Sequence, residues 1–281
     1  MRGFILKMKQ NSPIGIFDSG YGGLTVLKEI VKEIPQYDYL YLGDNARAPY
    51  GSRSFETVYE YTLQCVNYLF NQGCHIVVLA CNTASAKALR TIQQKDLPLI
   101  APNKRVLGVI RPTTELIGNY TKTNNVGVLG TLGTVNSGSY LVEIEKFFPN
   151  VNVYQEACPM WVPLIENNEL DNEGADFFIK KHVTNLMRQQ PKIDAIILGC
   201  THYPIVEKKI QQYLPPHVKL LSQGTIVAKS LKNYLKRHPE LESNCSKNNS
   251  IHFCTTDISE VFDKAARIFF DKDVKSKRIE L

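Results

Sequence analysis

Two segments of this chain occur twice, and this repetition limits the folds open to the chain more than any other feature. The run IGIFDSG at 14–20 resembles VGVLGT at 126–131, and IVVLACNT at 76–83 resembles AIILGCTH at 195–202. Gly15 and Gly127 are 112 residues apart, and Cys81 and Cys200 are 119 apart. Because the two spacings are similar, we infer that one α/β unit is duplicated.

Short β-branched runs alternate with amphipathic stretches along the sequence. The expected strands cover residues 13–17, 37–42, 76–80, 126–129, 151–154, 193–198, 218–221 and 251–254. The intervening stretches predict helices, including 54–71, 135–148, 172–189 and a last helix opened by Asp257, with Glu260 three residues later as in a capping box. This alternation and the duplication together predict an α/β fold of two similar lobes related by a pseudo-twofold axis. Each lobe is expected to be a parallel sheet flanked by helices, with the active site in the crevice between the lobes.

Composition narrows the classes of function. Of the 281 residues 43% are hydrophobic and 21% charged, as in ordinary globular proteins, and the longest apolar runs, 76–81 and 195–198, are too short to cross a bilayer. The net charge of +6 comes largely from Arg2, Lys7 and Lys9 and from the basic residues of 272–278. No basic stripe is interleaved with aromatic residues, so we expect neither a nucleic-acid partner nor a membrane partner. Residues 1–12 lack the apolar core of a signal peptide, which predicts a cytoplasmic protein. The sequence allows a homodimer but gives no oligomeric state.

Seven cysteines at irregular spacings resemble neither a disulfide framework nor a paired CxxC zinc site, so reduced thiols are expected. A cysteine that ends a buried strand is commonly a small hydrophobic residue. Cys81 and Cys200 differ because both end a repeated strand and both precede short polar residues. Since the carboxyl ends of parallel strands are where ligands bind, two facing lobes would direct both thiols to one crevice. The remaining cysteines are expected to be structural: Cys65, Cys74, Cys158, Cys245 and Cys254.

Asp18 and His202 are further candidates beside these strands. Asp18 precedes the glycine-rich run SGYGG, where it could simply cap a helix, and the run lacks both GxGxxG spacing and the ending of a P-loop. His202 lies two residues after Cys200, which is not a metal-ligand spacing, so we expect it to titrate or polarise the thiol. No metal site is predicted.

Four blocks of the sequence, in order, resemble the signature blocks of the glutamate racemases, a family within the aspartate/glutamate racemases. They are FDSGYGGL at 17–24, GDNARAPYG at 43–51, ACNTAS at 80–85 and LGCTHYP at 198–204. Two weaker blocks, 127–137 and 162–166, also fit, and the resemblance covers roughly residues 13–221. One departure is Ser222-Gln223-Gly224, where family members commonly carry an acidic residue. This departure leaves open any role for a carboxylate at that place.

The resemblance implies a cofactor-independent isomerase that supplies D-glutamate for peptidoglycan synthesis, and hence for cell wall biogenesis and cell shape. It implies that Cys81 and Cys200 are the catalytic acid and base, with Asp18 assisting the first and His202 the second. It also implies a set of residues that bind the substrate: Asp18, Ser19, Pro49, Tyr50, Gly51, Asn82, Thr83, Thr131, Thr134, Glu166, Thr201 and His202. The family fold implies a discontinuous first lobe, 11–105 plus 216–281, and a second lobe over 106–215.

The proposed chemistry suits these residue types. Inverting an α-carbon without a cofactor requires one group on each face of the carbon, one acting as a base while the other acts as an acid. Because cysteine has an ordinary pKa near 8.5, a thiolate and a thiol can exchange these roles after modest tuning. Two alternatives remain open: a racemase for aspartate or a related acidic amino acid, and a protein that binds an acidic amino acid without turning it over.

Overall fold

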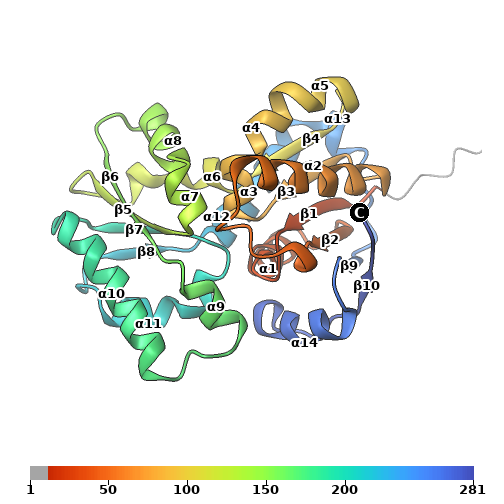
Figure 1. Cartoon of the computed structure of the whole chain (residues 1–281). Coiled ribbons are helices and arrows are strands. Elements are labelled where there is room, and N and C mark those ends of the chain that lie inside the picture. Colours follow the sequence, from red (N-terminus) through yellow and green to blue (C-terminus); the bar gives the residue numbers. More distant parts are fainter. Residues whose placement is uncertain (1–11) are drawn as a thin grey trace, which may run out of the picture.

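The computed structural model describes residues 12–281 as two lobes, each built on one parallel sheet (Figure 1). The strand order in the first sheet is β10-β9-β2-β1-β3-β4, and in the second β6-β5-β7-β8. The first sheet contains β1 (Ile14–Asp18), β2 (Tyr39–Gly43), β3 (Ile76–Leu79), β4 (Arg105–Gly108), β9 (Ile251–Thr255) and β10 (Ser276–Arg278). The second contains β5 (Asn125–Gly130), β6 (Asn152–Ala157), β7 (Ala195–Gly199) and β8 (Lys219–Leu221). The predicted α/β class, with parallel sheets flanked by helices, is confirmed.

The duplicated segments form the same pair of neighbouring strands in each sheet. Gly15 pairs with Val77 in β1 and β3, and Gly127 pairs with Ile196 in β5 and β7. A side chain at Gly127 would lie 2.7 Å from the Cδ2 atom of Leu186 on α10, so this strand needs a small residue where the helix packs on it. Because the two pairs share one register, Cys81 and Cys200 each lie four residues after the residue that pairs with the repeated glycine.

Helices cover both faces of each sheet (Figure 1). Those of the first lobe are α1 (Gly23–Glu33), α2 (Phe55–Asn71), α3 (Asn82–Lys87), α4 (Leu89–Thr91), α5 (Leu97–Ile100), α12 (Gln223–Arg237), α13 (Pro239–Glu242) and α14 (Ser259–Phe270), with the short η1 (Asn45–Arg47) and η2 (Ile92–Asp96). Those of the second are α6 (Ile110–Thr114), α7 (Leu132–Asn136), α8 (Ser139–Phe147), α9 (Trp161–Glu166), α10 (Glu173–Gln189) and α11 (Glu207–Gln212), with η3 (Ile117–Asn119) and η4 (Tyr203–Val206).

Sheet membership shifts both predicted lobe boundaries by a few residues. The boundary at 105/106 would cut β4, which pairs along its whole length with β3 of the first sheet. The boundary at 215/216 would assign β8 to the first lobe, but β8 pairs with β7 of the second sheet. The chain therefore crosses between the lobes after Gly108 and again after Leu221. As a division into separate domains, the two-lobe assignment stays a prediction, and its start at residue 11 lies outside the described residues.

Two expected helices differ in the structure. The helix expected over 135–148 is two helices, α7 and α8, because Gly138 between them has a left-handed backbone with φ of 63°. The capping box predicted at Asp257 and Glu260 is wrong, since α14 starts at Ser259 and the Asp257 carboxylate instead accepts from the N–H of Ile258. Strands β4 and β10 were not expected: β4 has only four residues, and β10 is a polar edge strand of three.

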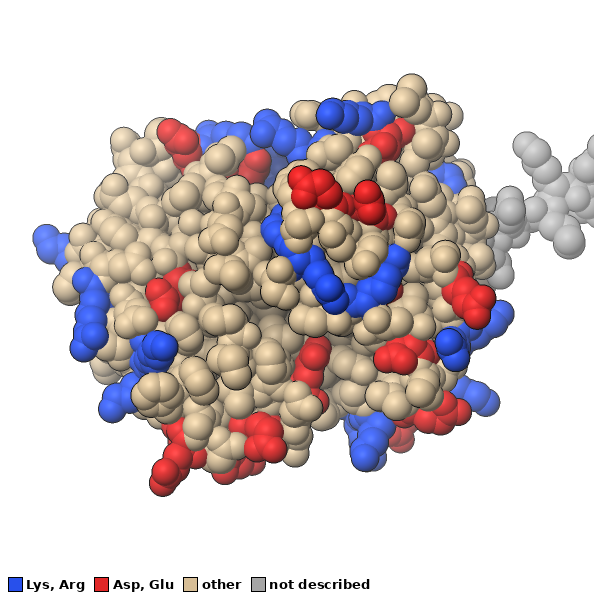
Figure 2. Space-filling model, viewed as in Figure 1, with Lys and Arg blue, Asp and Glu red and all other residues tan. Residues whose placement is uncertain are grey.

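Charged side chains are interspersed on the face drawn in Figure 2, and uncharged residues cover most of the left-hand lobe there. No helix within residues 12–281 is long and apolar enough to span a membrane. The predictions made for the N-terminal end, its basic residues and the lack of a signal peptide, concern a segment of which all but Ser12 lies outside the described residues.

Asp38 fixes the loop that leads into β9. Its buried carboxylate, 3% exposed, accepts hydrogen bonds from the backbone N–H groups of Asn248 (3.1 Å) and Ser250 (2.9 Å) and from both of their side chains. Burial alone would raise the pKa of Asp38, but these hydrogen bonds lower it to about 2. The carboxylate therefore holds the loop beside β2 and brings β9 into the sheet.

We expect Asp38→Ala to lower the free energy of unfolding by roughly 2 kcal/mol near neutral pH, because it leaves buried N–H groups unpaired. Since the folded-state pKa lies below the ordinary value near 3.9, the stabilisation by the carboxylate is complete above about pH 4 and is lost as the pH falls toward 2. Urea unfolding at pH 7 and at pH 2.5 measures this, with the exposed Asp171→Ala as control. A gap between Asp38→Ala and the wild type that fails to narrow at the lower pH would contradict this account.

Candidate functional site

A cavity of about 120 Å³ lies where the carboxyl ends of β1, β3, β5 and β7 meet. Residues from both lobes line it, among them most of those predicted from the sequence: Ser19, Pro49, Tyr50, Gly51, Cys81, Asn82, Thr83, Thr131, Glu166, Cys200, Thr201 and His202. Asp18 and Thr134 do not line the cavity. Both are fully buried directly behind it, and both contact residues that do line it.

Cys81 lies at the N-cap of α3, directly after β3. Its Sγ accepts from the backbone N–H of Ala84 at 3.4 Å and lies 3.3 Å from Ser19 Oγ. Burial, with the Asp18 carboxylate adding to it, raises the pKa of Cys81 to about 12, although these two hydrogen bonds oppose the rise. At neutral pH the thiol is therefore protonated, and once deprotonated it is a strong base.

Cys200 belongs to a short polar relay at the end of β7. Its Sγ lies 3.9 Å from Nδ1 of His202, whose Nε2 lies 2.9 Å from the carboxylate of Glu166 on α9. Burial alone would lower the pKa of His202, but its contacts with Cys200 and Glu166 raise it to about 10. The ring of His202 also packs edge-on against Phe269 of α14, with 5.2 Å between ring centroids. His202 therefore carries a positive charge next to the Cys200 sulfur at neutral pH.

Asp18 ends β1 and has one carboxylate oxygen that is unusual. Oδ2 accepts from the backbone N–H of Gly20 at 3.0 Å, whereas Oδ1 is buried without a hydrogen-bond partner among the described residues. Burial raises the pKa of Asp18, and the positive charge of His202 opposes the rise. Asp18 thus interacts electrostatically with both Cys81 and His202, one from each lobe.

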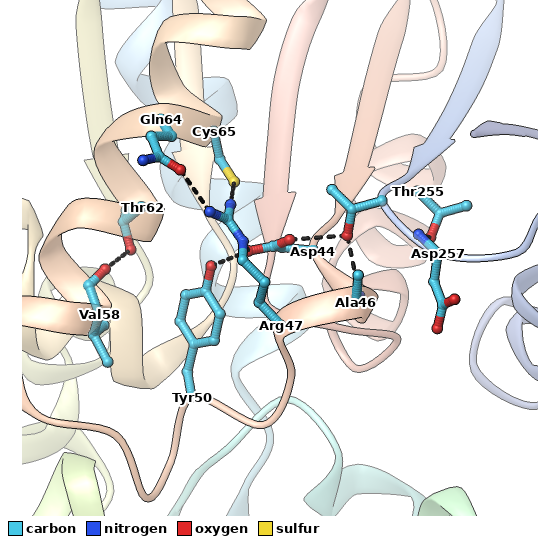
Figure 3. Close-up of polar contacts among 11 residues, drawn as sticks. Asp44, Ala46, Arg47, Tyr50, Val58, Thr62, Gln64, Cys65, Thr255 and Asp257 are labelled. Carbon is cyan, nitrogen blue, oxygen red and sulfur yellow. Dashed lines mark hydrogen bonds and ion pairs between the residues drawn. The ribbon is translucent and has the colours of Figure 1, made fainter. Parts of the chain in front are cut away.

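The loop that supplies Pro49, Tyr50 and Gly51 is held by an ion pair between buried Asp44 and half-buried Arg47 (Figure 3). The Asp44 carboxylate accepts from Arg47 Nε at 2.7 Å, from the Tyr50 hydroxyl, and from the Thr256 hydroxyl at 2.9 Å. Arg47 also donates to Gln64 of α2 at 2.5 Å. Figure 3 shows this guanidinium between α2 and the loop. Asp44 and Arg47 stand in the block 43–51 but had no predicted role, because a sequence pattern does not show the hydrogen bonds that this block makes to Gln64 and Thr256.

Direct contacts join the lobes beside the cavity. Thr83 Oγ1 of α3 lies 2.9 Å from Thr131 Oγ1, the N-cap of α7, and 3.4 Å from Thr134 Oγ1. The backbone N–H of Gly133 donates to the carbonyl oxygen of Gly51 at 2.7 Å. On the other side, the Thr25 hydroxyl of α1 donates to the carbonyl oxygen of Thr201 at 2.9 Å. The cavity is therefore walled by residues of both lobes that already contact one another.

Sequence analysis missed several wall residues: Gly20, Ala48, Ser52, Leu132, Cys158, Pro159, Val162 and Pro163. Cys158 was expected to be purely structural, yet it lines the cavity. It directly follows β6, so the rule that led to Cys81 and Cys200, a cysteine at the carboxyl end of a strand, could have found it too. Burial raises the pKa of Cys158 well above its ordinary value, which keeps this thiol protonated and weakly reactive.

The site thus combines the thiols of Cys81, Cys158 and Cys200, a buried carboxyl group, an imidazole and several hydroxyl groups with apolar walls. Within residues 12–281 no group of three or more His, Cys, Asp or Glu side chains could hold a metal ion. Titratable groups with shifted pKa values, here Cys81, His202 and Asp18, are typical of sites for acid and base catalysis. Two thiols from opposite lobes can act on opposite faces of one bound carbon atom. The fold and site together define an α/β enzyme of the racemase class.

Comparison with known proteins agrees with this geometry. The model of the Asp/Glu/Hydantoin racemase family matches residues 14–231. A glutamate racemase of Sulfurihydrogenibium is 38% identical over 270 residues, which cover 96% of this chain and 97% of the relative. Among solved structures, a glutamate racemase of Bacillus anthracis has a TM-score of 0.87 at 31% identity, covering 97% of this chain and 98% of its own. One from Francisella tularensis, solved in complex with D-glutamate, has a TM-score of 0.85 at 33% identity, covering 96% and 98%.

The chain therefore belongs to the Asp/Glu/Hydantoin racemase family, and the prediction of an isomerase of the amino-acid racemase type is confirmed.

Two glycines of the loop after β1 allow a matched test of the site's packing. A Cβ at Gly22 would overlap with His202 Nδ1 and Thr201 Oγ1, whereas a Cβ at Gly20 would lie 3.6 Å from the nearest atom, Oε1 of Glu166. We expect Gly22→Ala to lower the free energy of unfolding by about 1–3 kcal/mol through overpacking, and Gly20→Ala to change it much less. Urea unfolding of both variants measures this. Equal stabilities would show that His202 has room to move, contrary to the packing described.

Proposed function

We propose that this chain interconverts L- and D-glutamate without a cofactor, with Cys81 and Cys200 as the two acid/base groups. The observation that carries the proposal is the placement of these thiols after equivalent strands of two duplicated sheets, at one shared cavity. The relatives named glutamate racemase and the related structure with bound D-glutamate support glutamate as the substrate. From the family resemblance we also propose that the D-glutamate formed serves peptidoglycan synthesis and that the enzyme works in the cytoplasm.

In the proposed reaction, one thiolate removes the proton from the α-carbon and the opposite thiol donates its proton to the other face. The carbanion formed between these steps is stabilised because its negative charge spreads into the α-carboxylate of the substrate. Hydrogen-bond donors in the cavity wall stabilise that charge. Afterwards the first sulfur carries the proton and the second is the thiolate, so the enzyme is ready for the reverse direction. Burial supports this chemistry, since it makes the Cys81 thiolate a strong base for a weakly acidic proton.

The neighbouring groups tune the two thiols. Glu166 keeps His202 positively charged beside Cys200, while Asp18 acts on Cys81 from behind the cavity. We propose that the remaining predicted residues hold the substrate's carboxylates and ammonium group: Ser19, Pro49, Tyr50, Gly51, Asn82, Thr83, Thr131, Thr134 and Thr201. For Thr134, which is buried behind Thr83 and Thr131, that role is indirect, through their hydroxyl groups.

Purified protein, treated with a chelator and free of pyridoxal phosphate, should racemise either enantiomer of glutamate, as measured by circular dichroism of the substrate. Aspartate should be turned over at least 100-fold less efficiently. Activity that disappears on chelation and returns with metal would contradict the cofactor-free mechanism. Preference for aspartate would favour the alternative racemase, and binding of glutamate without turnover would indicate a binding protein.

The two cysteines can be told apart by isotope exchange. In deuterated water, early turnover of either enantiomer should place deuterium in the product and little in the recovered substrate, because the two faces use different groups. Cys81→Ala and Cys200→Ala should each lose racemisation by at least 10³-fold, roughly the effect of removing a positioned acid or base. Cys245→Ala, which changes a buried thiol on the far side of the first lobe, is the control.

The family resemblance suggests that Cys81 takes the proton from D-glutamate and Cys200 takes it from L-glutamate. Cys81→Ala should then retain slow exchange of L-glutamate only, and Cys200→Ala slow exchange of D-glutamate only. The opposite pairing would reverse the facial assignment. Early deuterium in wild-type substrate equal to that in product would indicate a single base and reject the two-thiol mechanism.

A further inference from the structure

Gln223 is the first residue of α12, immediately after the chain crosses back from the second sheet to the first (Figure 1). It belongs to the segment in which this sequence departs from its family. The side chain is 4% exposed, and every polar atom of its amide has a partner. A buried glutamine that is fully hydrogen-bonded at a crossing segment calls for an explanation beyond the packing of one helix.

The amide of Gln223 also contacts the other crossing segment. Its Nε2 donates to the carbonyl oxygen of Val109 at 3.0 Å, and Thr113 Oγ1 of α6 lies 3.1 Å from the same nitrogen. Val109 directly follows β4, where the chain leaves the first sheet. One side chain therefore joins both places at which the chain passes between the lobes.

Three side chains close a ring of hydrogen bonds at this point. Asn82 Nδ2 donates to Gln223 Oε1 at 2.7 Å, Gln223 Nε2 donates to the Tyr140 hydroxyl at 2.9 Å, and this hydroxyl donates to Asn82 Oδ1 at 2.7 Å. Within the ring each residue donates once and accepts once. Asn82 comes from the first lobe and Tyr140 from α8 of the second, so the ring also spans the two lobes.

The carbonyl of Val109 fixes the direction of the ring. A carbonyl oxygen can only accept, so the NH₂ group of Gln223 must face it and Oε1 must face Asn82. Asn82 must then present its NH₂ group to Gln223 and its oxygen to Tyr140. The second N–H of Asn82 Nδ2 has no acceptor among residues 12–281, and Asn82 lines the cavity next to Cys81.

We propose that Gln223 is a positioning residue: it holds the amide of Asn82 with an N–H available to the substrate and ties that orientation to both crossing segments. The inference rests on the proposed racemase function, in which Asn82 binds a substrate carboxylate. This role also explains why the chain departs from its family at 222–224, where an acidic residue is common. The position needs a hydrogen-bond donor, and an ionised carboxylate has none. A carboxylate here would place an acceptor oxygen against the carbonyl oxygen of Val109, which can only accept.

Gln223→Glu tests the donor while keeping the shape. The ionised carboxylate cannot donate to the Val109 carbonyl. The protonated acid has one donor and one acceptor, so it can again donate to Val109 and accept from Asn82. Because burial raises the pKa of a carboxyl group, the acid should form within the working pH range. We expect kcat/KM for glutamate to be at least 10-fold below wild type at pH 8.5 and to recover relative to wild type as the pH falls to 6.

Other titratable and charged groups face this cluster from the surrounding elements: Tyr140 on α8, Cys81 before α3, Cys200 after β7, Glu29 on α1 through Thr225, Arg111 on α6, paired with Glu115, and Glu207 on α11 through Ser222. Wild type and variant share all of these groups. The ratio of their kcat/KM values at each pH therefore isolates the titration at position 223.

Two further variants keep the test decisive if Gln223→Glu folds poorly at high pH. Gln223→Leu should lose activity to an extent that does not change with pH. Tyr140→Phe removes one member of the ring with little change in volume and should raise KM about 3–10-fold with a smaller change in kcat. Gln93→Glu is the matched control, because Nε2 of Gln93 also donates to a backbone carbonyl, that of Val106 at 2.7 Å, but away from the cavity.

An unchanged KM in Tyr140→Phe, or a loss in Gln223→Glu that is the same at every pH, would overturn the positioning role. These outcomes are distinct from failure of the proposed function, which wild-type protein reports in the same assay. An inactive wild type rejects the racemase, whereas an active wild type with unaffected variants rejects only the role of Gln223.

Discussion

The register of four parallel strands is the constraint on which the rest of the site depends. β1 pairs with β3 and β5 with β7 in the same alignment, so the chain leaves all four strands at one level of each sheet. Parallel pairing buries both faces of a strand, which confines polar side chains to its ends. Asp18, Cys81, Thr131 and Cys200 therefore emerge where the two sheets face each other. A slip of one residue in either pair would turn Cys81 or Cys200 into the core of its own lobe, and the cavity would lose one of these two facing thiols.

Burial is the second common cause, and it acts on each titratable group in a different way. It raises the pKa of Asp18 and of Cys81, while at His202 the contacts with Cys200 and Glu166 outweigh it and raise the pKa. Burial thus gives the Cys81 thiol a high proton affinity, whereas the Cys200 thiol has an imidazolium, that of His202, beside it. This asymmetry does not arise from different residue types at equivalent positions, because both positions carry cysteine. It arises from the neighbours that each lobe supplies.

The central strands and their cysteines could be predicted because local sequence determines them: each is an apolar, β-branched run followed at once by polar residues. The parts that could not be predicted depend on distant partners. Asp44 accepts from Thr256, which is 212 residues away, and Gln223 contacts Asn82 across 141 residues. Cys158 was misjudged because its strand, β6, is half-buried and has no repeated copy with a cysteine. The break between α7 and α8 requires the backbone angle of Gly138, which the hydrophobic pattern does not reveal.

The hydrogen bond between the N–H of Gly133 and the carbonyl oxygen of Gly51 does not depend on any side chain. It joins the lobes at the cavity wall with main-chain atoms alone. Side-chain substitutions at either position can crowd this bond but cannot delete the donor or the acceptor, and only proline at 133 would remove the N–H. Substitutions of the surrounding residues therefore leave both the donor and the acceptor of this bond in place, whereas a Cβ at Gly133 would lie 2.9 Å from the Gly51 oxygen. The side chains around the cavity can therefore be exchanged without removing the hydrogen bond that sets the separation between the two halves of the wall.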